Sequence, residues 1–478
     1  MRQRPAFGVF VLTLALVLGG ALLVGLGRGT TDPAAADAFD GTGRVVVRGA
    51  SMVLTMDPKA GEGPLGQLSD ADVLLEGDRI KAVGKNLDTG GARVVDGRGK
   101  IVLPGFVDMH NHLWQSLIRG CAGDKELNGW LGKCVLPLYS KPITEADGYA
   151  GVRLSTMDVI GTGITTVTDW SHTFNKPFAW GNLRALADSK IRFVFAYDAG
   201  SDPALQDAVR AANREFIEPN PLAHLQVGSH PALDNFGNLD ASAKLARELG
   251  VPLNVHLLES KADPATGQME ALRKADALRP GLVADHVIHA TDADLDELAK
   301  ADVRVAHNPL SNQRLASGII RLPEMHRRGM KVGLGLDGGT NDTSDMFNVM
   351  RAAVNLQRAV ATDPSVYPVV SDVLRMATLG GAQALGLDGE IGSLTPGKKA
   401  DLQVIDAQQV NFAPRVDWVN QVVYNTQPAN VQWVFVDGKA LKRDGRGGGG
   451  AAPPLVRAAP AGPGPRSTRQ PGRVRNGA

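Results

Sequence analysis

The stretch Ile101-Val-Leu-Pro-Gly-Phe-Val-Asp-Met-His-Asn-His112 decides the fold that this sequence predicts. It has the pattern of an apolar strand that carries a Pro-Gly break and ends on two histidines, His110 and His112. Because alternate residues of an extended strand point to the same side, both imidazoles can reach one ion. A His-x-His pair alone is weak evidence for a metal site, so its meaning depends on the surrounding elements.

Strands and helical stretches alternate around this motif, from residue 104 to residue 389. With the strand that leads into His110, eight strands are expected, and they predict an α/β protein with a (β/α)8 TIM barrel. In such a barrel the chemistry lies at the carboxyl ends of the strands. The other seven expected strands are 165–168, 192–197, 225–228, 253–256, 284–288, 304–306 and 331–336.

The two flanks of the barrel are rich in short alternating strands with Gly and Asp at the turns. They predict one small composite β-sandwich, built from residues 44–103 and 390–441. Residues 442–478 are expected to be a disordered tail, because they are rich in Gly, Pro and Arg and nearly devoid of large apolar side chains.

Residues 1–43 are expected to hold a signal or membrane-anchor segment followed by a linker. Arg2 and Arg4 precede an apolar run, residues 7–26, with no charge before Arg28. The run is longer than a typical signal core and just long enough to span a bilayer, so a cleaved signal and an uncleaved anchor both fit. The basic start predicts an exported or membrane-anchored protein with its folded part outside the cytoplasm.

The composition is that of a protein with a sizeable core: 43% of the 478 residues are hydrophobic and 21% are charged. The formal charge of +1 is unevenly spread. Without residues 441–478, which carry eight basic residues and one acidic residue, 43 basic residues face 49 acidic ones. No folded part is basic enough to indicate a nucleic-acid partner. A homo-oligomer is compatible with the sequence.

The two cysteines, Cys121 and Cys134, are too few for a disulfide framework. They could pair in an exported chain. The interpretation favoured by the sequence is two half-buried thiols.

Two further strand ends carry residues of the type that binds metals. His256 ends the apolar stretch 251–256, and Glu259 follows three residues later. Asp337 ends the glycine-rich stretch 332–337. Together with the His-x-His pair they predict three imidazoles and one carboxylate on one divalent ion, with a coordination position left for water.

These motifs, taken in order, resemble the amidohydrolase superfamily. The similarity is greatest to the branch that contains S-adenosylhomocysteine, guanine and s-triazine deaminases and chlorohydrolases, and it covers residues 44–440. Its motifs are Pro104-Gly-Phe-Val-Asp-Met-His-Asn-His112, Trp114-Gln-Ser-Leu-Ile-Arg-Gly120, Leu127-Asn-Gly-Trp-Leu131, His256-Leu-Leu-Glu259, Asp285-His286-Val-Ile-His289, Ala306-His-Asn-Pro-Leu-Ser-Asn312 and Leu336-Asp-Gly338.

The resemblance implies a role for each of these side chains. His110, His112, His256 and Asp337 would be the metal ligands, and Asp337 would also accept a hydrogen bond from the nucleophile. Glu259 would carry protons. His286 would polarise the attacking water or the forming tetrahedral centre.

One metal ion is expected rather than two. Many relatives bridge two ions with a modified lysine after the fourth strand, and the corresponding stretch 225–231 has no lysine. Zinc suits three nitrogens and one oxygen, and iron(II) is the alternative.

Further residues near the expected strand ends are candidates for contact with a small heterocyclic substrate, and Trp114 could stack on a flat ring. A structural role is as compatible with each of them. They are Trp114, Gln115, Arg119, His172, His230, His289, His307 and Asn308.

The leading functional hypothesis is metal-dependent hydrolytic deamination of an amino-substituted nitrogen heterocycle of purine, pterin or triazine type. One alternative is cleavage of another ring C–N or C–halide bond, or of a cyclic amide. A remote alternative is an inactive, membrane-tethered binding protein. The complete ligand set argues against this last hypothesis.

Overall fold

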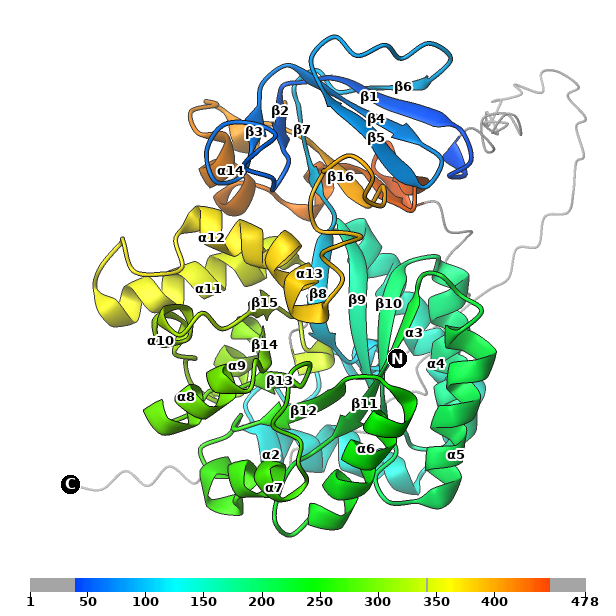
Figure 1. Cartoon of the computed structure of the whole chain (residues 1–478), viewed down its shortest axis with the longest axis vertical. Coiled ribbons are helices and arrows are strands. Elements are labelled where there is room, and N and C mark those ends of the chain that lie inside the picture. The colour runs from blue at the N-terminus through cyan, green and yellow to red at the C-terminus, as the bar shows by residue number, and fades with distance from the viewer. Residues whose placement is uncertain (1–38, 341–342, 448–478) are drawn as a thin grey trace, which may run out of the picture. The chain divides into compact units, whose positions relative to one another are not determined.

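A computed structural model describes residues 39–340 and 343–447 of the chain. Eight parallel strands form one sheet in sequence order, which confirms the predicted (β/α)8 barrel (Figure 1). The strands are β8 (Phe106–Asn111), β9 (Ile164–Ser171), β10 (Arg192–Asp198), β11 (Ala223–Ser229), β12 (Leu253–Leu257), β13 (Val283–His286), β14 (Arg304–His307) and β15 (Val332–Leu334).

The barrel closes where the segment after β15 meets β8. The backbone N–H groups of Leu336 and Asp337 donate to the carbonyl of His110, at 3.0 and 2.8 Å. The buried carboxylate of Asp108 accepts a further bond from the N–H of Leu336, at 3.0 Å. This seam therefore fixes the distance between His110 and Asp337.

Helices connect the strands and begin at clear capping signals. Thr144 and Asp147 form a reciprocal capping box at α3, and Thr291 and Asp294 form another at α8. The helices are α2 (Leu127–Trp130), α3 (Glu145–Gly161), α4 (Lys176–Ser189), α5 (Pro203–Ala212), α6 (Phe236–Leu249), α7 (Gln268–Lys274), α8 (Asp292–Lys300), α9 (Pro309–Arg314), α10 (Leu322–Arg327), α11 (Met346–Ala361), α12 (Val370–Arg375), α13 (Gly381–Leu385) and α14 (Trp418–Tyr424).

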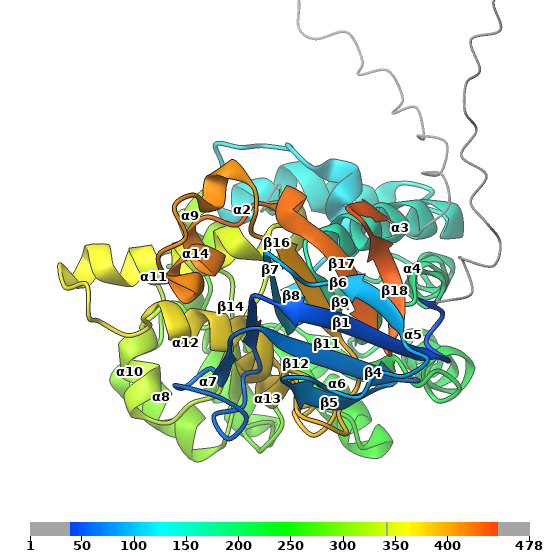
Figure 2. The same ribbon diagram turned by 90° about the horizontal axis from the view of Figure 1, so that it is seen from above.

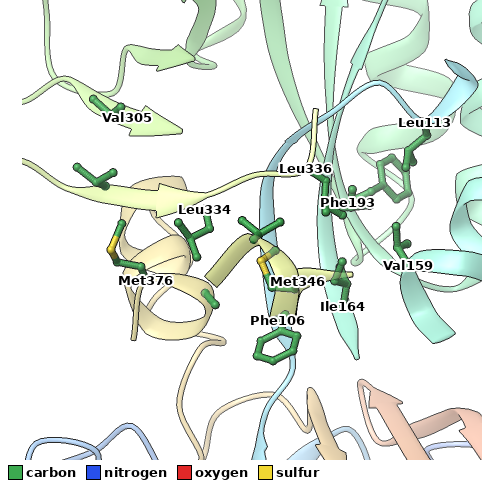
Figure 3. Packing of buried hydrophobic residues seen from close by; sticks show 14 of the residues in the cluster. Phe106, Leu113, Val159, Ile164, Phe193, Val305, Leu334, Leu336, Met346 and Met376 are labelled. Carbon is green, nitrogen blue, oxygen red and sulfur yellow. The ribbon is translucent and has the colours of Figure 1, made fainter. Parts of the chain in front are cut away.

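One large apolar cluster fills the space between the strands and the helices. Figure 3 shows part of it, with Phe106 of β8, Phe193 of β10, Leu334 of β15 and Met346 of α11. Phe106 also packs edge-on against Phe347, with ring centroids 5.1 Å apart. Because Phe106 begins β8, this packing anchors the strand whose far end carries the His-x-His pair.

The two flanks form a composite β-sandwich, as predicted. The first sheet has the order β5 (Arg79–Gly84), β4 (Ala71–Glu76), β1 (Arg44–Ala50) and β6 (Arg93–Asp96). The second sheet has the order β19 (Arg446–Gly447), β18 (Lys439–Arg443), β17 (Val431–Val436), β16 (Leu402–Asp406), β7 (Lys100–Pro104), β2 (Met52–Leu54) and β3 (Gln67–Leu68).

The second sheet mixes both ends of the chain, because β7 pairs antiparallel with β16. Figure 2 shows the blue strands of the N-terminal flank together with the orange strands β16, β17 and β18. Val47 and Val73 of the first sheet share an apolar core with Val404 and Trp433 of the second.

A buried ion network joins the sandwich to the amino end of the barrel. Arg192, at the start of β10, donates to both carboxylate oxygens of Asp401 at 3.1 and 3.2 Å, and to Asp437. The backbone N–H of Asp437 donates in turn to Asp401, at 2.8 Å. Arg192 and Asp401 are both 3% exposed, so their charges are compensated inside the protein.

The C-terminal boundary differs from the expectation. Residues 442–447, assigned by the sequence to a disordered tail, lie in the last hairpin. Asp444 and Gly445 form its two-residue turn with φ values of 47° and 75°. An Asp-Gly pair is a strong hairpin signal. The sequence-based prediction relied on the composition of the tail and overlooked this signal. Residues 448–478 lie outside the described residues.

The cysteines also differ from the favoured interpretation. Cys121 and Cys134 form a disulfide, which encloses the segment between them. The favoured interpretation of two thiols was therefore wrong, and the alternative of a pair is confirmed. Their distance along the chain did not reveal that helix α2 brings them together.

The prediction of an exported or membrane-anchored protein is not borne out by the described residues. Within residues 39–340 and 343–447, no helix is sufficiently long and apolar to cross a bilayer. The segment 7–26, on which this prediction depended, lies outside the described residues.

Candidate active site

The four expected metal ligands come together at the carboxyl ends of β8, β12 and β15. The Nε2 atoms of His112 and His256 are 3.3 Å apart. Oδ1 of Asp337 lies 3.3 Å from Nε2 of His110 and 3.4 Å from Nε2 of His112. Three imidazole nitrogens and one carboxylate oxygen therefore surround one small volume. Zinc and iron(II) are bound by this kind of donor set.

Close polar contacts behind two of the imidazoles orient them for this task. Nδ1 of His110 lies 2.9 Å from a carboxylate oxygen of Asp285, and Nδ1 of His112 lies 2.6 Å from the carbonyl of Trp170. Each Nδ1–H can donate to its oxygen, which leaves the lone pair of Nε2 directed at the shared volume. In the sequence Asp285 stands out only as the neighbour of His286, and its contact with His110 was not predicted.

The backbone turns sharply at two of the site residues. Asp337 has a φ of 65° and His286 a φ of 74°, in the left-handed region that side chains with a Cβ seldom adopt. Strain of this kind concentrates at functional sites. The hydroxyl of Ser311 donates to Oδ2 of Asp337, so the second carboxylate oxygen is held as well.

Glu259 and His286 lie together beside the four ligands. Nε2 of His286 is 3.6 Å from Oε2 of Glu259 and 3.9 Å from Oδ2 of Asp337. On the other side of the ring, the amide nitrogens of Asn312 and Asn308 lie 3.0 and 3.3 Å from Nδ1. Amide N–H groups that donate to Nδ1 leave the proton of a neutral imidazole on Nε2, which then faces Glu259.

Burial shifts both groups toward their uncharged forms. It lowers the pKa of His286 to about 3, so this ring is a neutral hydrogen-bond donor at pH 7. Burial, and then the negative charges of Asp337 and Asp263, raise the pKa of Glu259 well above the ordinary value of a glutamate. A carboxyl group with a raised pKa is suited to accept a proton and give it back.

A cavity of about 200 Å³ opens onto these groups. His112, His256, Glu259 and Asp337 line it, whereas His110 and His286 are fully buried and do not. The remaining lining residues are Gln115, Leu127, Asn128, Trp130, Leu131, His172, His230, Asp263, Gln268 and Leu315.

Three of the eight candidate substrate contacts line this cavity: Gln115, His172 and His230. Gln115 is also fixed from behind, because its Oε1 accepts the N–H of Gly339 at 2.9 Å. The ring of His230 stacks on that of His256, with centroids 4.7 Å apart.

The other five candidates lie off the cavity. Trp114 is buried behind His172, Arg119 pairs with Asp158 at 2.8 Å, and Nε2 of His289 lies 2.7 Å from the carbonyl of Ser317. His307 and Asn308 are buried as well, and Asn308 contacts His286. The lone aromatic that could have stacked on a substrate is therefore a packing residue.

Helix α2 and the short π-helix after it provide a part of the cavity wall that the sequence did not predict. Leu127, Asn128, Trp130 and Leu131 all come from this segment, inside the disulfide loop. The motif Leu127-Asn-Gly-Trp-Leu131 could have predicted this part of the wall, because it belongs to the family resemblance, but it was not assigned to the site.

Comparison with known proteins bears directly on this geometry. The model of the amidohydrolase family matches residues 101–441. The chain belongs to the amidohydrolase family. It is thus a hydrolase that acts on C–N bonds other than peptide bonds, and the family uses a divalent metal. The four converging donors at the mouth of the barrel fit such an ion.

Two curated relatives extend over most of this chain. A 5'-deoxyadenosine deaminase of Methanothermobacter thermautotrophicus is 33% identical over 397 residues, which cover 80% of this chain and 91% of that protein. A 5-methylthioadenosine/S-adenosylhomocysteine deaminase of Syntrophobacter fumaroxidans is 32% identical over 413 residues, which cover 83% and 92%.

Among solved structures, an adenosine deaminase from Xanthomonas campestris with bound zinc is similar. It has a TM-score of 0.77 and 25% sequence identity, and the match covers 85% of this chain and 95% of the other. Guanine deaminase from C. acetobutylicum has a TM-score of 0.73 at 20% identity, which shows the common fold alone.

Proposed function

We propose that this protein is a hydrolytic deaminase of an aminopurine, with an adenosine-type nucleoside as the first substrate to test. The observation that carries the proposal is the pairing of Glu259 and His286, 3.6 Å apart, beside four convergent metal-ligating atoms. A metal site alone has many uses, whereas a proton carrier that lines the cavity, with a neutral hydrogen-bond donor directly beside it, suits hydrolysis. The names of the relatives indicate the purine.

The four ligands have the first role in this mechanism. His110, His112, His256 and Asp337 would hold one divalent ion, for which zinc is proposed and iron(II) is the alternative. When bound, such an ion lowers the pKa of a coordinated water molecule to near neutral. Asp285 and the carbonyl of Trp170 keep two of the imidazoles in the tautomer that coordination requires.

Glu259 and His286 would then handle the proton and the developing charge. The carboxylate of Glu259 takes a proton from the attacking water and delivers it to the ring nitrogen next to the reacting carbon. Nε2–H of His286 donates toward the oxygen that becomes attached to that carbon. Glu259 then takes the remaining proton of the attacking water from the new C–OH group and gives it to the amino group. The C–N bond breaks, ammonia leaves, the C–OH group becomes a carbonyl, and Glu259 ends as the carboxylate with which it began.

A substrate panel tests this proposal. Ammonia release by the purified chain is measured with adenosine, 5'-deoxyadenosine, guanine, a pterin and an amino-triazine, and bound metal is counted in the same sample. Release of chloride and alkylamine is measured with a triazine that carries chloro and alkylamino groups. We expect about one equivalent of metal and the highest kcat/KM with an adenosine-type nucleoside. Release of halide or alkylamine from a triazine, with no ammonia from any purine, would favour the alternative of another ring substituent.

A matched pair of variants links the activity to the site. His112→Ala removes a lining ligand, whereas His326→Ala removes a histidine whose ring stacks on Tyr367 in a different part of the barrel. Only the first should lose metal and ammonia release together. Full activity of His112→Ala without metal would refute the mechanism.

A further inference from the structure

The ring of His172 lies on the cavity wall next to a proposed metal ligand. It follows β9, lies against the ring of His112 with centroids 4.6 Å apart, and is 8% exposed. It lines the same cavity as Glu259 and Asp337. The mechanism above gives this histidine no task.

Trp114 decides which nitrogen of His172 carries a proton. The indole Nε1–H of Trp114 donates to Nδ1 of His172 at 3.3 Å. An indole nitrogen can only donate, so Nδ1 must be an acceptor and cannot hold a proton. This excludes both the Nδ1–H tautomer and the imidazolium, and it leaves the proton of a neutral ring on Nε2.

The indole is itself held in place. Trp114 is 1% exposed and packs edge-on against Phe174 and Phe178, with ring centroids 5.1 and 6.0 Å away. It therefore cannot swing away without opening the core. Within the described part of the chain, the side chain of His172 has one hydrogen bond, which it accepts from Trp114.

We propose that His172 binds the substrate and that its Nε2 always acts as a hydrogen-bond donor, because Trp114 occupies Nδ1. Such a donor selects substrates whose heterocycle presents an unprotonated acceptor atom. This inference rests on the proposed function and deepens it. The acceptor is a second lone pair, distinct from the ring nitrogen that Glu259 protonates. In an aminopurine it would be N3 or N7.

The selectivity arises because a buried hydrogen-bond donor without an acceptor destabilises the complex. A substrate with C–H in place of the acceptor leaves the Nε2–H of His172 without a partner, so its kcat/KM should be lower by about tenfold or more. Sites built around such a group reject analogues that lack its partner.

Deaza nucleosides test the selectivity. kcat/KM is measured for adenosine, 3-deazaadenosine and 7-deazaadenosine with the unmodified protein, His172→Phe and the control His326→Phe. We expect the unmodified protein and the control to discriminate about tenfold or more against one of the two analogues. We expect His172→Phe, which keeps a ring against His112, to lose this discrimination.

Unchanged discrimination in His172→Phe, against both analogues, would overturn the inference. This outcome differs from failure of the proposed function, in which the unmodified protein releases no ammonia from adenosine.

The tautomer can be measured without any activity. Nitrogen-15 NMR of the full chain, with the His172 signals identified by their loss in His172→Phe, should show Nε2 protonated and Nδ1 unprotonated at neutral pH. Trp114→Phe keeps an aromatic ring but removes the donor, and it should give a mixture of tautomers. A protonated Nδ1 in the unmodified protein would refute the proposal even if the substrate were another heterocycle.

Discussion

The two ends of the barrel both bury charge, but they compensate it in opposite ways. At the amino end, Arg192 meets Asp401 and Asp437, and each charge has its partner within the protein. At the carboxyl end, the nitrogens of His110, His112 and His256 and an oxygen of Asp337 converge on one another. Nitrogen and oxygen lone pairs that face each other repel, and a cation bound between them removes this repulsion. The amino end is therefore complete as folded, whereas the carboxyl end presents a donor set that fits a metal ion.

The largest effect is expected from breaking the carboxyl-end cluster. His256→Ala should lower kcat/KM by about 10⁴-fold or more, because the ion that activates water is lost. The control His224→Ala, at the start of β11, should keep both metal and activity. Metal analysis together with ammonia release checks this, and a fully metallated, active His256→Ala would contradict the ligand assignment.

Glu259→Gln should retain the metal but lose proton transfer. The expected loss is about 10²- to 10⁴-fold in kcat, since the amide can neither take nor return a proton. Steady-state kinetics and the metal content are measured on one preparation. A loss of metal equal to the loss of activity would show that Glu259 acts through the ion instead.

Arg192→Leu breaks the amino-end network and should affect stability rather than chemistry. Removing one partner of a buried ion pair leaves uncompensated charge, at a cost of about 3–5 kcal/mol in the free energy of unfolding. Urea denaturation measures this cost, and kcat/KM under native conditions should be unchanged. A drop in kcat/KM in the folded variant would show that the two ends are coupled.

Asp285→Asn tests the support behind His110. The variant keeps the size of the side chain but removes the negative charge that holds Nδ1–H of His110. Metal affinity should fall about 10- to 100-fold. Titration with a competing chelator measures the affinity, and an unchanged dissociation constant would remove Asp285 from the site.

Acid should destabilise the carboxyl end through His307. Burial lowers its pKa to about 3 in the folded state, against the ordinary histidine value of 6.5. The unfolded chain therefore binds more protons below pH 6.5, and stability present at neutral pH is lost as the pH falls toward 3. Between pH 7 and pH 5 the loss from this group is about 2 kcal/mol. Denaturation curves of His307→Asn should show that much less pH dependence, and equal slopes would contradict the shift.

Local patterns in the sequence were sufficient for the barrel and for the residues that meet at its mouth. His110, His112, His256 and Asp337 each follow an apolar strand, and parallel strands of a barrel end on the same rim. A pattern within a few residues thus predicted a meeting of groups more than 200 positions apart. The Asp444-Gly445 hairpin was equally local, and the composition of the tail concealed it.

The remaining features depend on contacts between distant segments, for which no local pattern exists. Asp285 reaches His110 across the barrel, and α2 brings Cys121 to Cys134. The indole of Trp114 turns away from the cavity to lock His172.

The sequence by itself determined the strand order, the composite sandwich and the kinds of donor atom at the rim, because these follow from periodicity and from residue chemistry. Only the tertiary structure decided which way each ring points, which nitrogen carries its proton and which candidates reach the cavity. Side-chain direction and tautomer are set by packing and by hydrogen-bond partners that lie far apart along the chain.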